Sequence, residues 1–158
     1  MTFKLLSKAA LALATMGLCL SAASAAYKSE YKLSVVPGAS SGWGQTATFF
    51  ADCVRQKSNG RINIKPYFGA QLMAGKQTSE LLLVRRGAID FALASTINWS
   101  PQIKELNLTA LPFFVANNPD RYKAIDAIEA GKSGKMLEKA IEKTGVKFLG
   151  WSENGFRE

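Results

Sequence analysis

The sequence contains no histidine, and this absence narrows the chemistry that the chain can perform. Histidine is the side chain that titrates near neutral pH and the most common metal ligand in proteins. No histidine-based catalytic triad and no zinc site with histidine ligands can therefore be built from this chain alone. Catalysis by carboxylates or by lysine is left open, so the enzyme hypotheses are reduced in number and not eliminated.

Cysteine is almost as scarce, with two in 158 residues. Cys53 lies on an apolar helix face, which favours a small buried hydrophobic side chain. There is also no C-x-x-C pair and no G-x-S-x-G nucleophile elbow. Gly42-Trp43-Gly44 lacks the later glycine and the lysine of a phosphate-binding loop. Nothing places a nucleophile beside a base, and we predict no cofactor, no metal and no catalytic residue.

Acidic residues are outnumbered by basic residues, 12 to 20, which gives a formal net charge of +8. Such an excess favours an anionic partner, whether a small acid, a membrane surface or a nucleic acid. Arg85-Arg86 is the only adjacent basic pair, and no run reaches the roughly five to eight cations of a nucleic-acid patch. We therefore expect no nucleic-acid partner and assign most of the excess to lysines on solvated helix faces.

Long apolar runs are absent except near the N-terminus, where two lysines precede a run rich in alanine and leucine. The run ends at Ala23-Ser24-Ala25, which matches the signal-peptidase pattern, and it is shorter than the roughly 20 residues of a membrane span. Residues 1–25 are therefore predicted to be a signal peptide that is cleaved before Ala26. Leu18 lacks the small side chain that a lipoprotein signal needs before Cys19. We expect the mature protein in the periplasm of a Gram-negative bacterium.

The mature chain, residues 26–158, alternates between strand and helix patterns. Short apolar or alternating runs predict four strands, over residues 31–36, 61–67, 89–94 and 146–151. Pro66 cannot donate a ladder hydrogen bond, so the second strand should lie near a sheet edge. No internal repeat or domain linker is visible. This order predicts an α/β fold with a mostly parallel sheet and helices on both of its faces.

Helical spacing and caps predict the elements between these strands. Four helices are expected: from Trp43 to a stop at Ser58-Asn59-Gly60, from a cap at Thr78 or Ser79 to Gly87, from a cap at Asn118 to an interruption at 131–134, and from there to Gly145. Residues 95–101 are predicted to be a polar loop. Residues 102–115 are ambiguous, because a helical pattern gives way to an apolar Leu-Pro-Phe-Phe run.

Three predicted loops follow strands, at residues 37–42, 95–100 and 152–158. In a parallel sheet these loops emerge at one edge and line one crevice. Arg157 could hold a carboxylate there with two parallel charge-assisted hydrogen bonds. The candidate ligand contacts are the arginine and the polar, aromatic and glycine residues of these loops: Gly38, Trp43, Ser95, Asn98, Trp99, Asn154 and Arg157. Ordinary solvated turns and packed tryptophans remain as alternatives.

Asp90 is the only acidic residue in the apolar third strand. A structural carboxylate that caps a neighbouring backbone is favoured there over a catalytic one. The enzyme alternative, a periplasmic α/β enzyme, would have to use Asp90 or Glu153. A third alternative is an interaction module that uses the basic surface.

Four stretches carry a resemblance to a known family: FADCVRQKSNGRINIKPY (50–67), GAQLMAGKQTSELLLVRRGAIDFALAS (69–95), ALPFF (110–114) and GWSENGFRE (150–158). In their order and spacing they resemble the N-terminal half of a solute-binding protein of tripartite ATP-independent periplasmic (TRAP) transporters, of the dicarboxylate-binding type. The resemblance implies a lobe like that of periplasmic binding proteins, in a two-lobe protein whose second lobe is absent here. It also implies capture of a small organic acid without chemistry and delivery to membrane permease subunits. We expect the protein to be a monomer.

The resemblance also suggests site residues. An arginine in an N-G-x-R segment lies in the family's ligand cleft, and Asn154-Gly155-Phe156-Arg157 matches that segment. The loops matched by residues 38–43 and 95–99 contribute in ways that vary with the ligand. The family's main carboxylate-binding arginine comes later, beyond Glu158. We therefore expect the chain to be a fragment.

Overall fold

The computed structural model describes residues 27–111, 115 and 117–152. Three strands in this part of the chain form one parallel sheet in the order β2-β1-β3. They are β1 (Tyr31–Val35), β2 (Ile64–Tyr67) and β3 (Phe91–Leu93). Leu33 in the central strand is opposite Pro66 on one side and Phe91 on the other. The predicted α/β class and the edge position of the strand with Pro66 are confirmed.

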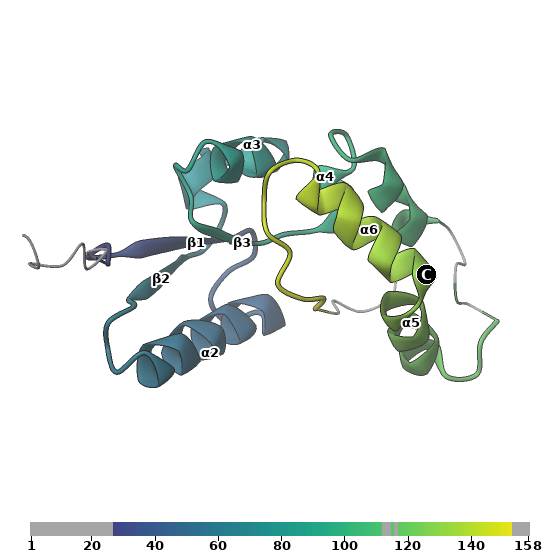
Figure 1. Ribbon diagram of the computed structural model, residues 1–158, viewed down its shortest axis with the longest axis horizontal. Helices are drawn as coiled ribbons and strands as arrows, with labels where there is room; N and C mark the ends of the chain where they lie inside the picture. Colours follow the sequence, from purple (N-terminus) through teal and green to yellow (C-terminus); the bar gives the residue numbers. More distant parts are fainter. Residues whose placement is uncertain (1–26, 112–114, 116, 153–158) are drawn as a thin grey trace, which may run out of the picture.

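Helices cover both faces of the sheet. Helix α2 (Gly42–Lys57) lies on one side of the strands and α3 (Glu80–Arg85) on the other (Figure 1). Alternate side chains of each strand point to opposite faces. Leu33 and Val35 accordingly pack with Ala47 of α2, whereas Ser34 contacts Glu80 of α3. The sheet therefore separates two hydrophobic clusters.

Helix α2 begins and ends where the sequence predicts. The Ser41 hydroxyl accepts a hydrogen bond from the backbone N–H of Gly44 (3.0 Å) and caps the first turn. At the other end Asn59 and Gly60 have φ values of 53° and 74°, a left-handed conformation that stops a helix. The predicted helix and its stop are confirmed.

The connection from β2 to β3 consists of short helical pieces. Two 3₁₀ turns, η1 (Gln71–Met73) and η2 (Gln77–Ser79), lead directly into α3. Gly87 (φ 71°) ends that helix before β3, as predicted. The predicted cap at Ser79 does not act as one, because its side chain makes no capping hydrogen bond.

The predicted polar loop at 95–101 is wrong, because this segment contains a helical turn, α4 (Thr96–Trp99). The carbonyl of Ser95 accepts hydrogen bonds from the backbone N–H groups of Asn98 and Trp99. The Trp99 ring is 8% exposed, and its burial keeps the turn against the core. The ambiguous segment after it forms a 3₁₀ helix, η3 (Lys104–Ala110), which buries Leu106.

The last two helices are α5 (Arg121–Ala130) and α6 (Lys132–Glu142). The predicted cap at Asn118 is wrong: Asp120 caps α5 by accepting from Lys123 N–H (3.0 Å). The predicted interruption at 131–134 shrinks to one residue, Gly131, because α6 begins directly after it. A Cβ atom at Gly134 would lie 1.8 Å from the Glu129 carbonyl oxygen. Gly134 is thus a site of helix contact and not of helix breaking.

The predicted strand at 146–151 is wrong. Val146, Phe148 and Trp151 are partly buried and pack on the core cluster of the α3 face, while Leu149 between them is 69% exposed. The alternation from Val146 to Leu149 fits an extended chain, yet none of the three described strands pairs with it. A strand requires a neighbour with free backbone groups as well as a period of two.

No helix in the described part of the chain combines the length and the apolar character of a membrane span. The predicted signal peptide, residues 1–25, lies outside the described residues.

Candidate functional site

The carboxyl ends of β1 and β3 meet at one edge of the sheet, because the two strands are parallel and Val35 is opposite Leu93. The loop after β1 and helix α4 after β3 therefore start side by side. This confirms the predicted juxtaposition for two of the three loops. Asn154, Arg157 and the alternative acid Glu153 belong to the third loop and lie outside the described residues.

The loop after β1 is a tight turn that leads into α2. The carbonyl of exposed Gly38 accepts from the Ser41 hydroxyl (2.6 Å) and backbone N–H (3.1 Å). A Cβ atom at Gly44 would lie 2.4 Å from the Ala39 carbonyl oxygen, so only glycine lets the helix approach the turn this closely. The sequence interpretation missed this role of Gly44. Trp43, in the first turn, is half-buried against the cluster on the α2 face.

The candidates after β3 differ in their surroundings. Ser95 is half-buried and precedes α4 without a side-chain capping bond. The Asn98 side-chain amide donates to the Gln77 side-chain oxygen (2.9 Å). Trp99 is part of the hydrophobic core, and its indole N–H donates to Glu80 (3.0 Å). A ring this buried cannot wall a crevice in this conformation, so Trp43 is the aromatic candidate with surface near the two described loops.

Glu80, the first residue of α3, was missed by the sequence interpretation. Its side chain is 0% exposed. One carboxylate oxygen accepts from the Ser34 hydroxyl (2.6 Å) and the other from the Trp99 indole (3.0 Å). Burial raises the pKa of Glu80, against the opposing effect of these two hydrogen bonds. An acid in the first turn of a helix ordinarily suggests a surface residue that complements the helix dipole, so the sequence carried no signal of its burial.

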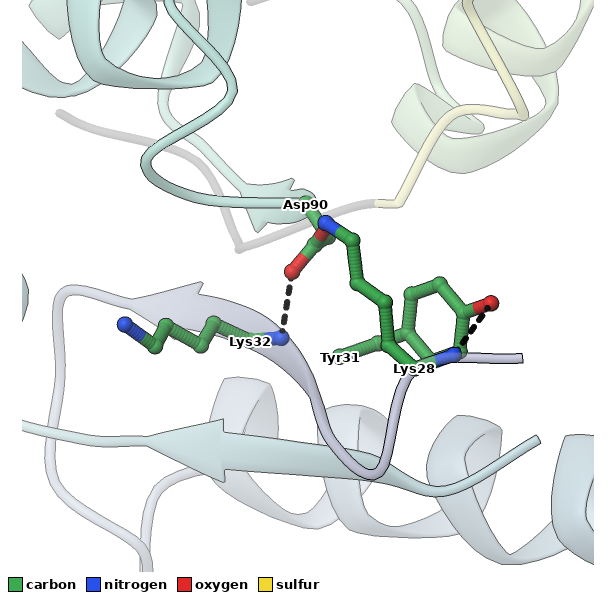
Figure 2. Close-up of polar contacts among 4 residues, drawn as sticks. All are labelled: Lys28, Tyr31, Lys32 and Asp90. Atoms are coloured by element: carbon green, nitrogen blue, oxygen red, sulfur yellow. Dashed lines mark hydrogen bonds and ion pairs between the residues drawn. The ribbon is translucent and has the colours of Figure 1, made fainter. Parts of the chain in front are cut away.

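Asp90 lies at the amino end of β3, at the sheet edge opposite the loops. Figure 2 shows its carboxylate between the Lys28 side chain and the backbone of Lys32. Lys32 N–H donates to it (2.9 Å), and the Lys28 ammonium forms an ion pair with it. Desolvation pushes the pKa of Asp90 up, but these interactions outweigh it and hold the pKa below its usual value. The structural interpretation of Asp90 is confirmed.

No group of three or more cysteine, aspartate or glutamate side chains that could hold a metal ion occurs within residues 27–111, 115 and 117–152. A surface hollow lies between α2 and β2, where Thr48, Arg55 and Lys65 line it. That hollow is not at the edge where the two loops emerge. The candidate site is therefore the open edge formed by the loop after β1 and by α4.

Solved structures similar to this chain include periplasmic solute-binding proteins of TRAP transporters. One from Ralstonia eutropha H16, with (S)-2-acetolactate bound, is 54% identical, has a TM-score of 0.77, and matches 82% of this chain and 40% of its own. One from Polaromonas sp. JS666, bound to D-erythronate, is 26% identical with a TM-score of 0.71, and the match covers 82% of this chain and 41% of that one.

Curated relatives agree with the structures. The 2,3-diketo-L-gulonate-binding periplasmic protein YiaO of Escherichia coli K12 is 28% identical over 69% of this chain and 31% of its own length. The C4-dicarboxylate-binding periplasmic protein DctP of Rhodobacter capsulatus is 26% identical over 72% of this chain and 33% of its own. The chain thus spans about a third of these relatives.

Residues 33–158 match the model of the family described as bacterial extracellular solute-binding protein, family 7. The chain belongs to this family. The resemblance seen in the sequence is confirmed.

Proposed function

We propose that this chain is part of the solute-binding subunit of a TRAP transporter, which captures a small organic acid in the periplasm and passes it to membrane permease subunits. The observation that carries the proposal is the paired loops at one edge of a parallel sheet, in a chain 54% identical to a protein that holds acetolactate. Capture of this kind needs closure of two lobes around the ligand and no chemical step. We accordingly propose that the protein is not an enzyme and acts as a monomer.

The ligand that we propose is a short hydroxy or oxo acid. Acetolactate carries both groups beside its carboxylate, and the Polaromonas protein is bound to erythronate, a polyhydroxy acid. Neutral donors such as those of Ser95 and Asn98 suit the hydroxyl and oxo oxygens of such acids. Arg157 and Asn154 would hold the carboxylate, while Gly38 and Trp43 would bound the ligand on the side of the loop after β1.

The enzyme alternative loses one of its two acids. Asp90 is held by Lys28 and the Lys32 backbone at the opposite edge of the sheet, and its lowered pKa makes it a weak base. The interaction-module alternative has no comparable observation in its favour.

A thermal-shift screen of the mature gene product against short organic acids, acetolactate among them, tests the proposal. A specific ligand at hundredfold excess over its Kd stabilises by about 2.7 kcal/mol. For a protein of 150–250 residues each kcal/mol raises the Tm by roughly 2–4 °C. If no acid raises the Tm, the proposed function fails.

Two arginine variants test the site. Arg157→Ala should abolish the shift, because it removes the proposed carboxylate clamp. Arg86→Ala, at the exposed end of α3, is the matched control and should keep the shift. A shift that survives Arg157→Ala would remove Arg157 from the site and leave the rest of the proposal standing.

A further inference from the structure

The buried carboxylate of Glu80 joins three elements that are far apart in the sequence. Its two oxygens have separate partners: Ser34 in the central strand β1 and Trp99 at the end of α4. Each partner has one polar hydrogen, and each donates it to Glu80. All three side chains are buried, at 0%, 1% and 8% exposed for Glu80, Ser34 and Trp99. The arrangement is a closed polar network inside an apolar core.

Residues 77–80, the short segment that ends at Glu80, make two more side-chain hydrogen bonds to α4 and the residues after it. The Asn98 amide donates to the Gln77 side chain, and the Gln102 amide donates to the Thr78 carbonyl, both at 2.9 Å. Residues 77–80 therefore contact Asn98 and Trp99 of α4 and Gln102 just after it. Of these three contacts, the one through Glu80 also reaches β1.

A charge in this position destabilises the fold. In the described part of the chain no ion pair reaches Glu80, and burial raises its pKa. A buried ionisable group is often less favourable than an apolar side chain of similar volume, and in some proteins such a group selects one packing over the alternatives. Leucine at this position would fill the space and leave the Ser34 hydroxyl and the Trp99 indole without partners. The geometry thus favours a role in fixing positions over a role in stability.

The two elements that Glu80 joins lead to the candidate site. Ser34 lies near the end of β1, just before the loop that contains Gly38. Trp99 ends the helical turn that begins after Ser95. We propose that Glu80 is a positioning residue that holds the loop after β1 and helix α4 in a fixed relation, so that the ligand edge is preformed. This inference rests on the proposed function for its purpose, but its mechanical content is measurable without any ligand.

Amide hydrogen exchange of the ligand-free protein tests it. The reporters are hydrogen-bonded amides in the two joined elements: Trp99, Ser100 and Ile103 on one side, and Ser41 on the other. Glu80→Leu should speed exchange at both sets of amides roughly tenfold or more, which corresponds to the loss of a hydrogen bond to a charged group. Glu80→Gln should restore slow exchange, since its oxygen can accept from Trp99 while its amide donates to Ser34.

Two further variants decide the matter if Glu80→Leu does not fold. Ser34 lies in β1 and reaches α4 through Glu80, so Ser34→Ala should speed exchange at Trp99 and Ser100, because Glu80 is then fixed by one partner only. Trp99→Phe should in turn speed exchange at Ser41. Ile64→Ala, a cavity on the other face of the sheet, is the control for a general loss of stability.

The inference is supported if Ser34→Ala speeds exchange in α4 and Trp99→Phe speeds exchange at Ser41. The control, Ile64→Ala, should not speed exchange at these amides more than at others. It is overturned if Ser34→Ala and Trp99→Phe act only on their own elements, or if Glu80→Gln behaves like Glu80→Leu. Failure of every organic acid to bind would overturn the proposed function and leave this result unchanged.

Discussion

The two ends of the sheet each have a buried or partly buried carboxylate, and the two carboxylates differ in their partners and in the direction of their pKa shifts. At the amino end Asp90 meets a lysine ammonium and a backbone N–H, and its pKa is lowered. At the carboxyl end Glu80 meets two neutral donors, and burial raises its pKa. The first arrangement stabilises the fold as an ion pair does. The second lowers stability and fixes geometry, and it lies under the edge where the loops after β1 and β3 emerge.

The largest effect should come from Trp99→Ala at the carboxyl end. The change removes a ring that is 8% exposed and leaves a Glu80 oxygen without its donor. Loss of a buried tryptophan costs about 3–5 kcal/mol. Urea unfolding followed by circular dichroism measures the change. A loss below about 1 kcal/mol would contradict the burial of Trp99.

Glu80→Gln should have the opposite sign and raise stability at neutral pH. Because the pKa of Glu80 is raised in the folded state, the protonated carboxyl group favours folding. This contribution to stability is complete below the unfolded pKa of about 4.3 and is lost as the pH rises through the folded pKa. Glutamine does not ionise and escapes this loss. The free energy of unfolding, measured from pH 4 to 8, should therefore fall less for the variant, and parallel curves would contradict the prediction.

Asp90→Asn should lower stability at neutral pH by about 1 kcal/mol, the typical worth of a hydrogen bond. Because the folded pKa of Asp90 is lowered, its contribution is present above the unfolded pKa of about 3.9 and is lost as the pH falls through the folded value. The difference from the native protein should thus shrink toward pH 3. Unfolding at pH 3 and 7 measures it, and a difference that grows in acid would reverse the assignment.

The smallest effect should come from Lys28→Met, which removes the ammonium and keeps the Lys32 backbone bond. The lysine side chain is 56% exposed, so the ion pair contributes about 0.2–1 kcal/mol and is screened by salt. The loss should be visible in 20 mM salt and disappear near 1 M. Lys57→Met at the exposed end of α2 is the matched control. Equal effects in both variants would show that the pair with Asp90 contributes nothing.

The sequence predicted the α2 face better than the α3 face. Apolar spacing along α2 and the alternation in β1 determine one face of packing, and the predicted stop at Gly60 determines where the helix ends. On the α3 face the pattern of polar residues gave a wrong prediction. Residues 95–101 contain polar side chains that suggest a loop, but the burial of Trp99 makes part of them a helical turn.

The predicted site divides in the same way. The loops after β1 and β3 meet because the strands are parallel, and the alternation of strands and helices in the sequence predicts that arrangement. The functions of Trp99 and Glu80 depend on which side chains meet across the sheet. Spacing along one segment holds no information on such contacts.

Local pattern by itself therefore determined the α/β class, the edge position of the strand with Pro66, the family and the edge at which the loops after β1 and β3 meet. These features depend on periodicity and turn chemistry within short stretches of chain. Only the tertiary structure decided that Trp99 belongs to the core, that Gly134 is a helix contact, that residues 146–151 pair with none of the described strands, and that Glu80 joins β1 to α4. These outcomes depend on contacts between residues distant in sequence, because burial and pairing are properties of both partners together.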